Sequence, residues 1–527
     1  MSTHLRNHSL RCAVAAAAGA AALVWLGPPG ADLAAHVYQR AMFIQHGFAL
    51  WSNYWYAGHY SYVTYSVLYY PLAAVIGIKL LAVATAAVAA GAFASLIRSE
   101  WPTAGLWPAR AFAFVAAVSV LSGAYPYALG LAIGLLALRA ARGDARIFAI
   151  LLALTFAASP LAFGLVALIL VAAAASTRSR IGARGATVIA LAGLGAVLWR
   201  IFPDNGRFPF STAELGTSLA FCALGAAFTW HVPAARLLRS FFIVYAVAIL
   251  TFFLIPSGIG ENIARLRFVA LPIAVLALSL RRFRPVLPAV IILVLATSWN
   301  ITPLAFSYAH QSADPSAKAA YWQPVVHYLH RHLSPSYRVE AVDTSGHWEA
   351  VYLPQAGIPI ARGWFRQDDF PQNALLYGRL NAGAYLSWLR RLGVRYVVLT
   401  DAPPDYSARR EARLLRGGRS GLSPVLRSAH ATLYAVPRPR GIVTGATGAV
   451  VTHFGASAIT VDLPAPGDYR VAVRYSPYWH AEDACVEHLP DGMLGLDVVH
   501  PGKVKIEFAV TAQRALSAGA ATQRDCP

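Results

Sequence analysis

The sequence predicts a polytopic α-helical membrane protein of about 11 helices, with the N-terminus inside, the C-terminus outside and an extracytoplasmic α/β plus β-sandwich C-terminal region. Two observations predict this fold class. Of the 527 residues, 57% are hydrophobic and only 13% are charged, whereas a soluble domain carries about 25% charged residues. Apolar runs dominate from about residue 10 to 303, and from about 304 to 527 the composition is that of a soluble domain.

The chain is expected to form three domains, namely a transmembrane domain (1–303), an extracytoplasmic α/β domain (304–437) and a small antiparallel β-sandwich (438–527). In the α/β domain, a helix over 384–392 stops at Gly393, and Val394–Leu399 is a typical buried strand. In the last domain, short alternating strands are expected at 458–463, 469–475, 494–499 and 504–510, with Pro-Gly turns between them.

The first apolar run, Ala13–Leu26, is expected to remain as the first membrane helix. A cleaved signal peptide is the alternative, because the run is short and small residues follow it. A loop over about 28–63 comes next and is rich in tyrosine and tryptophan. Amphipathic rings settle at the membrane–water interface, so we expect this loop to lie there.

Two apolar segments, Ala111–Leu138 and Ile147–Ala175, are flanked by arginine on both sides and have turn signals in the middle. If basic flanks stay in the cytosol, each segment must enter the membrane and return. Each arm has about 14 residues and would span about 21 Å, less than the roughly 30 Å hydrocarbon core. We therefore predict two short hairpins.

The remaining crossings are expected at Tyr70–Ile97, Gly185–Phe202, Thr212–Thr229, Phe241–Ile255, Phe268–Leu280 and Val286–Thr302. The loops that contain Arg236 and Arg281 are basic and should face the cytosol. The chain then emerges outside near residue 303, which places the protein in the inner or plasma membrane with an extracytoplasmic C-terminal region. In that compartment Cys485 and Cys526 can form a disulfide.

The formal net charge of +20 does not indicate a nucleic-acid partner. Most arginines of the first half lie in short loops between apolar runs, where basic residues orient a membrane protein. Membrane lipids and lipid phosphates are the more natural partners of this charge.

Asp32 and His36 are the candidate catalytic residues. They lie just after the first apolar run and share one face of a helix, because they are four residues apart. A carboxylate at the mouth of a helical bundle can hold a divalent cation or take a proton from an acceptor hydroxyl. The alternative is that Asp32 only caps the helix that starts at Leu33.

Candidate substrate-binding residues cluster in an outer loop between two crossings. Arg265 and Arg267 can grip a lipid phosphate in bidentate fashion. The alternative is a Glu261–Arg265 pair at helical spacing. Lys79, which lies within an apolar stretch, is a further candidate for the phosphate. The full set of binding candidates is Arg265, Arg267, Glu261, Asn262, Lys79 and Trp55.

The chain resembles GT-C type glycosyltransferases, which use polyprenyl-phosphate sugars. More narrowly, it is similar to bacterial multi-pass proteins labelled 6-pyruvoyl-tetrahydropterin synthase-related, a label that describes no chemistry visible in this sequence. The residues that carry the resemblance are Asp32, His36, Gly47, Trp51, Gly58, Tyr70-Pro71-Leu72, Gly260-Glu261-Asn262, Arg265-Leu266 and Leu392-Gly393-Val394-Arg395-Tyr396-Val397-Val398.

The resemblance implies sugar transfer from a polyprenyl-phosphate donor to an extracytoplasmic cell-envelope glycan or glycolipid, with Asp32 as base or metal ligand. Many such enzymes have two acids in the first loop, whereas this chain has one. We therefore expect Asp32 to act as a base without a metal ion, and a divalent cation as cofactor is the alternative. The alternatives are a transporter or flippase of lipid-linked saccharides and a non-catalytic envelope-assembly protein with the same fold.

Overall fold

The computed structural model describes residues 3–63, 65–177, 182–203, 206–517 and 526. The chain forms two compact units. The helical unit comprises Met1–His36, Tyr65–Ala196 and Arg207–Ala313, and the C-terminal unit comprises Val37–Thr64, Val197–Gly206 and Asp314–Pro527. The sequence did not predict that the aromatic segment 37–64 belongs with the C-terminal half.

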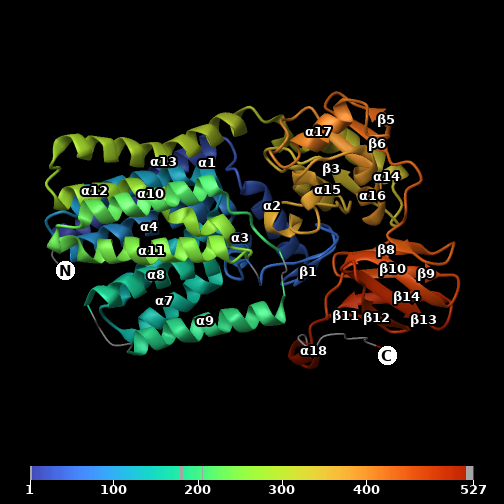
Figure 1. The fold of residues 1–527 in the computed structure, drawn as a ribbon, viewed down its shortest axis with the longest axis horizontal. Coiled ribbons are helices and arrows are strands. Elements are labelled where there is room, and N and C mark those ends of the chain that lie inside the picture. The colour runs from blue at the N-terminus through green and yellow to red at the C-terminus, as the bar shows by residue number, and fades with distance from the viewer. Residues whose placement is uncertain (1–2, 64, 178–181, 204–205, 518–525, 527) are drawn as a thin grey trace. The chain divides into compact units, whose positions relative to one another are not determined.

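The helical unit consists of long apolar helices, most of which run side by side along one direction in Figure 1. The helices are α1 (Thr3–Leu26), α3 (Tyr69–Ile76), α4 (Ile78–Glu100), α5 (Leu106–Val118), η1 (Ser119–Ser122), α6 (Tyr125–Ala140), α7 (Ala145–Ala158), α8 (Pro160–Thr177), α9 (Ala183–Ile201), α10 (Thr212–Thr229), η2 (Pro233–Ala235), α11 (Arg236–Leu254), η3 (Gly260–Val269), α12 (Ala270–Leu280) and α13 (Val286–Ser312). Helix α2 (Leu33–His46) begins in this unit and continues into the C-terminal unit, and the last residues of α9, from Val197 on, also belong to the C-terminal unit.

Seven helices in the described part of the chain are long and apolar enough to cross a membrane, and three shorter apolar helices accompany them. Helix α9 has no buried residue, although its sequence is apolar. Ile189, Val197 and Trp199 on this helix are 52–71% exposed. An apolar helix without a buried face is stable only where the surrounding medium is itself apolar. These features identify a membrane protein.

The two predicted hairpins occur as helix pairs whose turns lie where the sequence places them. Helices α5 and α6 are separated by η1 and Gly123, and α7 and α8 are separated by Ser159. The prediction of four equally short arms is wrong for α8, because its 18 residues are enough for a crossing. Alanines form the contacts inside the bundle: Ala16, Ala90 and Ala109 have no exposed surface, so the helix backbones approach closely.

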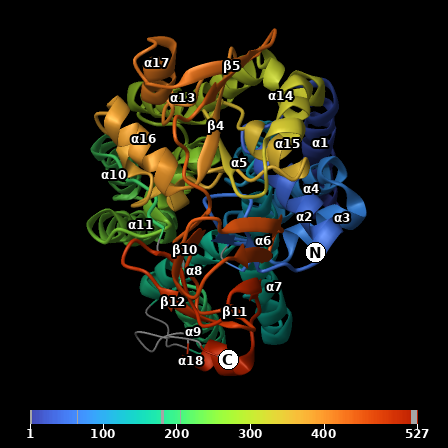
Figure 2. The ribbon, with the colours of Figure 1, turned by 90° about the vertical axis from the view of Figure 1, so that its right-hand side faces the viewer.

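The α/β part of the C-terminal unit is built on a four-stranded sheet in the order β3-β4-β6-β5. Strands β3 and β4 are parallel, and the other pairs are antiparallel. Figure 2 shows α16 on one side of β4 and α14 and α15 on the other. The elements are η4 (Pro315–Ala317), α14 (Ala319–His332), β3 (Arg338–Ala341), α15 (Glu349–Gln355), η5 (Arg366–Asp369), η6 (Ala374–Tyr377), α16 (Ala382–Arg391), β4 (Val394–Thr400), α17 (Arg409–Arg416), β5 (Ser423–Arg427) and β6 (Ala431–Ala435).

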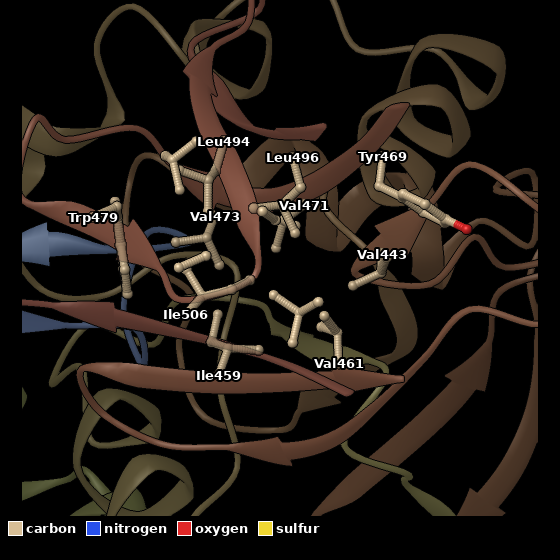
Figure 3. Close-up of a cluster of buried hydrophobic side chains, with 14 of the residues drawn as sticks. Val443, Ile459, Val461, Tyr469, Val471, Val473, Trp479, Leu494, Leu496 and Ile506 are labelled. Atoms are coloured by element: carbon tan, nitrogen blue, oxygen red, sulfur yellow. The ribbon is translucent and has the colours of Figure 1, made fainter. Parts of the chain in front are cut away.

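The last part of the chain forms two four-stranded sheets, in the orders β12-β13-β10-β7 and β11-β14-β9-β8. Their inward-facing side chains form one apolar core (Figure 3). The elements are β7 (Val443–Thr444), β8 (Val450–Phe454), β9 (Ala458–Leu463), β10 (Gly467–Arg474), β11 (Trp479–Ala481), β12 (Ala484–His488), β13 (Met493–Val498), β14 (Gly502–Phe508) and α18 (Ala512–Ser517). The structure joins Cys485 and Cys526 in a disulfide, as expected from the sequence.

The aromatic segment 37–64 forms a small hairpin, β1 (Trp51–Ser52) and β2 (His59–Tyr60), within the C-terminal unit. Trp51 is 2% exposed, and its ring stacks on Phe508 at 5.0 Å. Trp55 has no exposed surface and donates from Nε1 to the Ala350 carbonyl at 2.9 Å. The expectation that these rings lie at the membrane interface is therefore wrong, because they form part of a protein core.

Candidate active site

Asp32 lies on a loop that is held against the turn between η1 and α6. The backbone amides of Ala31 and Asp32 donate to the carbonyls of Leu121 and Ser122 at 3.1 and 3.0 Å. Gly123 adopts a φ of +72°, and a Cβ at this position would lie 2.6 Å from the Asp32 nitrogen. The turn thus fits against the Asp32 loop only because residue 123 has no side chain.

We expect Gly123→Ala to lower the stability of the helical unit by about 2 kcal/mol, because alanine is strained at positive φ and its methyl would displace the Asp32 loop. Thermal unfolding of the detergent-solubilised chain measures this effect. Gly164→Ala is the matched control, since a Cβ there meets nothing within 4 Å in the middle of α8. Equal melting temperatures for the two variants would contradict the close contact.

His36 is surrounded by tyrosines at the start of α2. It has no exposed surface, and its Nδ1 lies 3.2 Å from the Tyr70 hydroxyl. The rings of Tyr65, Tyr69, Tyr70 and Tyr125 have centroids 5.6–6.1 Å from the imidazole. Burial lowers the pKa of His36 to about 3, so the ring is neutral at physiological pH. A buried neutral ring of this kind can orient its neighbours rather than supply charge.

Arg265 in η3 reaches the same group of residues. Its guanidinium lies over the Tyr127 ring at 5.3 Å, and its Nε donates to Asn262 Oδ1 at 2.9 Å. Burial raises the pKa of the Tyr65 phenol, the charge of Asp32 raises it further and the charge of Arg265 opposes this. Asp32 and Arg265 are far apart in the sequence, but the backbone of one and the guanidinium of the other both lie against the start of α6.

Arg267 has a different environment from Arg265. Its guanidinium pairs with Glu214 of α10, with N–O distances of 2.6 and 2.7 Å to the two carboxylate oxygens. The Arg267 carbonyl also accepts from Asn300 Nδ2 at 3.0 Å. Since Arg267 joins η3 to α10 and α13, its role is to position η3. Glu261, the other predicted binding residue in this segment, is partly buried in the first turn of η3.

Two other predicted binding residues lie elsewhere. Lys79 is exposed in the first turn of α4. Trp55 belongs to the C-terminal unit, where its ring stacks on Tyr38 at 4.3 Å and has no exposed surface. A fully enclosed ring cannot stack on a sugar, so Trp55 is corrected to a core residue.

Among the residues that the structure describes, Asp343, His347 and Glu349 form the one group of three that could share a metal ion. Asp32 is not in that group. Sequence reasoning missed these three residues, because the preceding strand β3 contains the buried charged residues Arg338 and Glu340 and does not resemble a buried strand. The Asp-Thr-Ser-Gly-His run after that strand was the available signal.

Asp32 supplies a carboxylate and Arg265 supplies a guanidinium, and both residues lie against the start of α6. No family model, no curated protein and no solved structure matches this chain.

Proposed function

We propose that the protein is a GT-C type membrane glycosyltransferase that transfers a sugar from a polyprenyl-phosphate donor to an extracytoplasmic cell-envelope glycan or glycolipid. One arrangement carries the proposal: the Asp32 amide donates to Ser122 just before α6, and the Arg265 guanidinium lies over the ring of Tyr127 in the first turn of α6. A transferase of this kind needs an acid–base group for the acceptor and a cation for the donor phosphate, and these two residues supply that pair.

The charge distribution supports an outward-facing site. Arg98, Arg110, Arg139 and Arg146 lie at the ends of α4 to α7 that are remote from Gly123 and Asp32. Basic residues mark the cytosolic ends of membrane helices, so the Asp32 end would face outward. Eleven crossings among the described residues, namely the seven long apolar helices together with α5, α6, α7 and α10, would place the N-terminus inside and the C-terminal unit outside. The Cys485–Cys526 disulfide agrees with an oxidising compartment.

In the proposed mechanism, Arg265 binds the donor phosphate and Asp32 accepts the proton of the acceptor hydroxyl. The acceptor oxygen then attacks the anomeric carbon, and the bond from that carbon to the phosphate oxygen breaks. The electron pair leaves with polyprenyl phosphate, whose growing charge Arg265 stabilises. His36 is a positioning residue, because it is enclosed by tyrosines and contacts Tyr70 rather than a substrate.

Comparing two neighbouring arginines tests the donor site. Arg265→Ala is expected to raise the KM for the polyprenyl-phosphate donor about 10- to 100-fold, since a charge-assisted contact contributes about 1.5–3 kcal/mol. Arg267→Ala should leave that KM unchanged and lower the melting temperature, because it leaves Glu214 without its cation. Transfer assays at varied donor concentration and thermal unfolding separate the two effects. A wild-type donor KM in Arg265→Ala would contradict the proposed donor site.

A further inference from the structure

A group of buried polar side chains lies beyond the ends of two parallel strands in the C-terminal unit. Asp343, His347 and Glu349 follow β3, and Asp405 follows β4, the parallel neighbour of β3. The carboxyl ends of parallel strands meet at one edge of a sheet, and α/β proteins bind ligands at that edge. The position of the group is therefore one where a ligand site is expected.

Asp343, His347 and Glu349 each offer one ligand atom, and these atoms all lie within 4.8 Å of one another. The three residues are 4%, 8% and 1% exposed. His347 Nδ1 is buried and makes no hydrogen bond, although Glu349 Oε1 lies 3.4 Å away. An imidazole nitrogen that lies beside a carboxylate and makes no hydrogen bond can bind a cation.

The charge balance of the surrounding network is negative. Arg362 contacts Glu340, Asp343 and Glu411 at 2.6–2.8 Å, and Arg366 contacts Asp405 at 2.8 Å. With Glu349, five mostly buried carboxylates stand against two guanidinium groups and the imidazole of His347, which lies beside Glu349 and Asp405. Buried charges are costly unless they are paired with opposite charges. A divalent cation beside Asp343 and Glu349 would offset most of the excess negative charge of these carboxylates.

Neighbouring side chains orient the candidate ligands Glu349 and His347, as second-layer partners do at known metal sites. Thr344 donates to both Glu349 oxygens, from its amide at 3.2 Å and its hydroxyl at 2.7 Å. The other ring nitrogen of His347, Nε2, faces Asp405 at 3.8 Å. A carboxylate behind the non-ligating nitrogen of a histidine is the common arrangement at zinc sites.

We propose that Asp343, His347 and Glu349 bind a divalent transition-metal ion of the Zn²⁺ type in the C-terminal unit. The mixed nitrogen and oxygen set favours Zn²⁺ over Mg²⁺ and Ca²⁺, which prefer oxygen ligands alone. Three protein ligands leave one tetrahedral position for a water or a substrate oxygen. The proposal is independent of sugar transfer at Asp32, because it concerns residues of the other unit.

Metal content of the purified full-length protein tests the proposal. After chelation and dialysis, we expect calorimetric titration with Zn²⁺ to show one site per chain and the bound ion to raise the melting temperature. His347→Gln and Glu349→Gln should each weaken Zn²⁺ binding about 100-fold or more. His332→Ala is the matched control, since this histidine is exposed on α14 and should leave binding unchanged.

Two results would overturn the proposal. The first is that the folded wild-type chain binds neither Zn²⁺ nor Mn²⁺ stoichiometrically. A proton on His347, rather than a metal ion, would then compensate the buried carboxylates. Stoichiometric binding that persists at full affinity in His347→Gln and Glu349→Gln would place the metal elsewhere. The wild-type titration decides the first result even if a variant fails to fold.

Discussion

Replacing Asp32 with asparagine is expected to reduce sugar transfer about 1,000-fold, which is typical for the loss of a general base. Asparagine caps a helix as well as aspartate does, so the start of α2 should remain intact. The substitution therefore separates the proposed catalytic role from the capping role. Transfer of labelled sugar in membranes that contain equal amounts of each variant measures the effect.

Asp144→Asn is the matched control for this prediction. Asp144 caps α7, where its carboxylate accepts from the amides of Arg146 and Ile147 at 2.6 and 3.3 Å. This variant should keep wild-type transfer because Asp144 lies at the other end of the helices from Asp32. Full activity in Asp32→Asn would remove Asp32 from the mechanism. Equal losses in both variants would point to helix capping.

Arg362→Leu is expected to destabilise the C-terminal unit by about 3–5 kcal/mol. Arg362 is 1% exposed, and its removal leaves Glu340, Asp343 and Glu411 buried without their shared cation. Breaking a buried ion pair from one side has an effect of this size. Thermal unfolding of the full-length protein in detergent measures it.

The effect of Arg362→Leu should depend on pH. Burial raises the pKa of Glu340, and the charge of Arg362 counteracts this rise. Without Arg362, the folded chain would bind protons that the unfolded chain releases, so the variant's stability should fall as pH rises from 6 to 8. Arg470→Leu is the control: its partner Asp491 is 35% exposed, and the expected loss is below about 1 kcal/mol. A loss of similar size in both variants would show that the buried network contributes no special stability.

Local periodicity was sufficient to predict the long apolar helices and the strands β4, β9, β10, β13 and β14. Strand β9 has the predicted bounds, and its alternating burial explains why the period of two identified it. The turns at Gly123 and Ser159 were visible because glycine and proline interrupt long apolar runs. These signals are local, so they need no knowledge of tertiary packing.

The candidate sites could be predicted only in part, because their geometry depends on long-range contacts. The sequence singled out Asp32 and Arg265, but nothing local distinguished Arg265 from Arg267, which pairs with Glu214 in another helix. Trp55 looked interfacial, although it packs against residues near 350 and 365 in the C-terminal unit. The Asp343 group was missed since buried charged residues in β3 hide the strand from hydropathy patterns.

The most direct test of the proposed function is a reconstitution of the purified protein in liposomes with a polyprenyl-phosphate sugar and a glycan or glycolipid acceptor. We predict that polyprenyl phosphate is released as labelled sugar appears on the acceptor, and that Asp32→Asn eliminates both products. Translocation of the labelled lipid across the bilayer, with no release of polyprenyl phosphate, would contradict sugar transfer and identify a flippase instead.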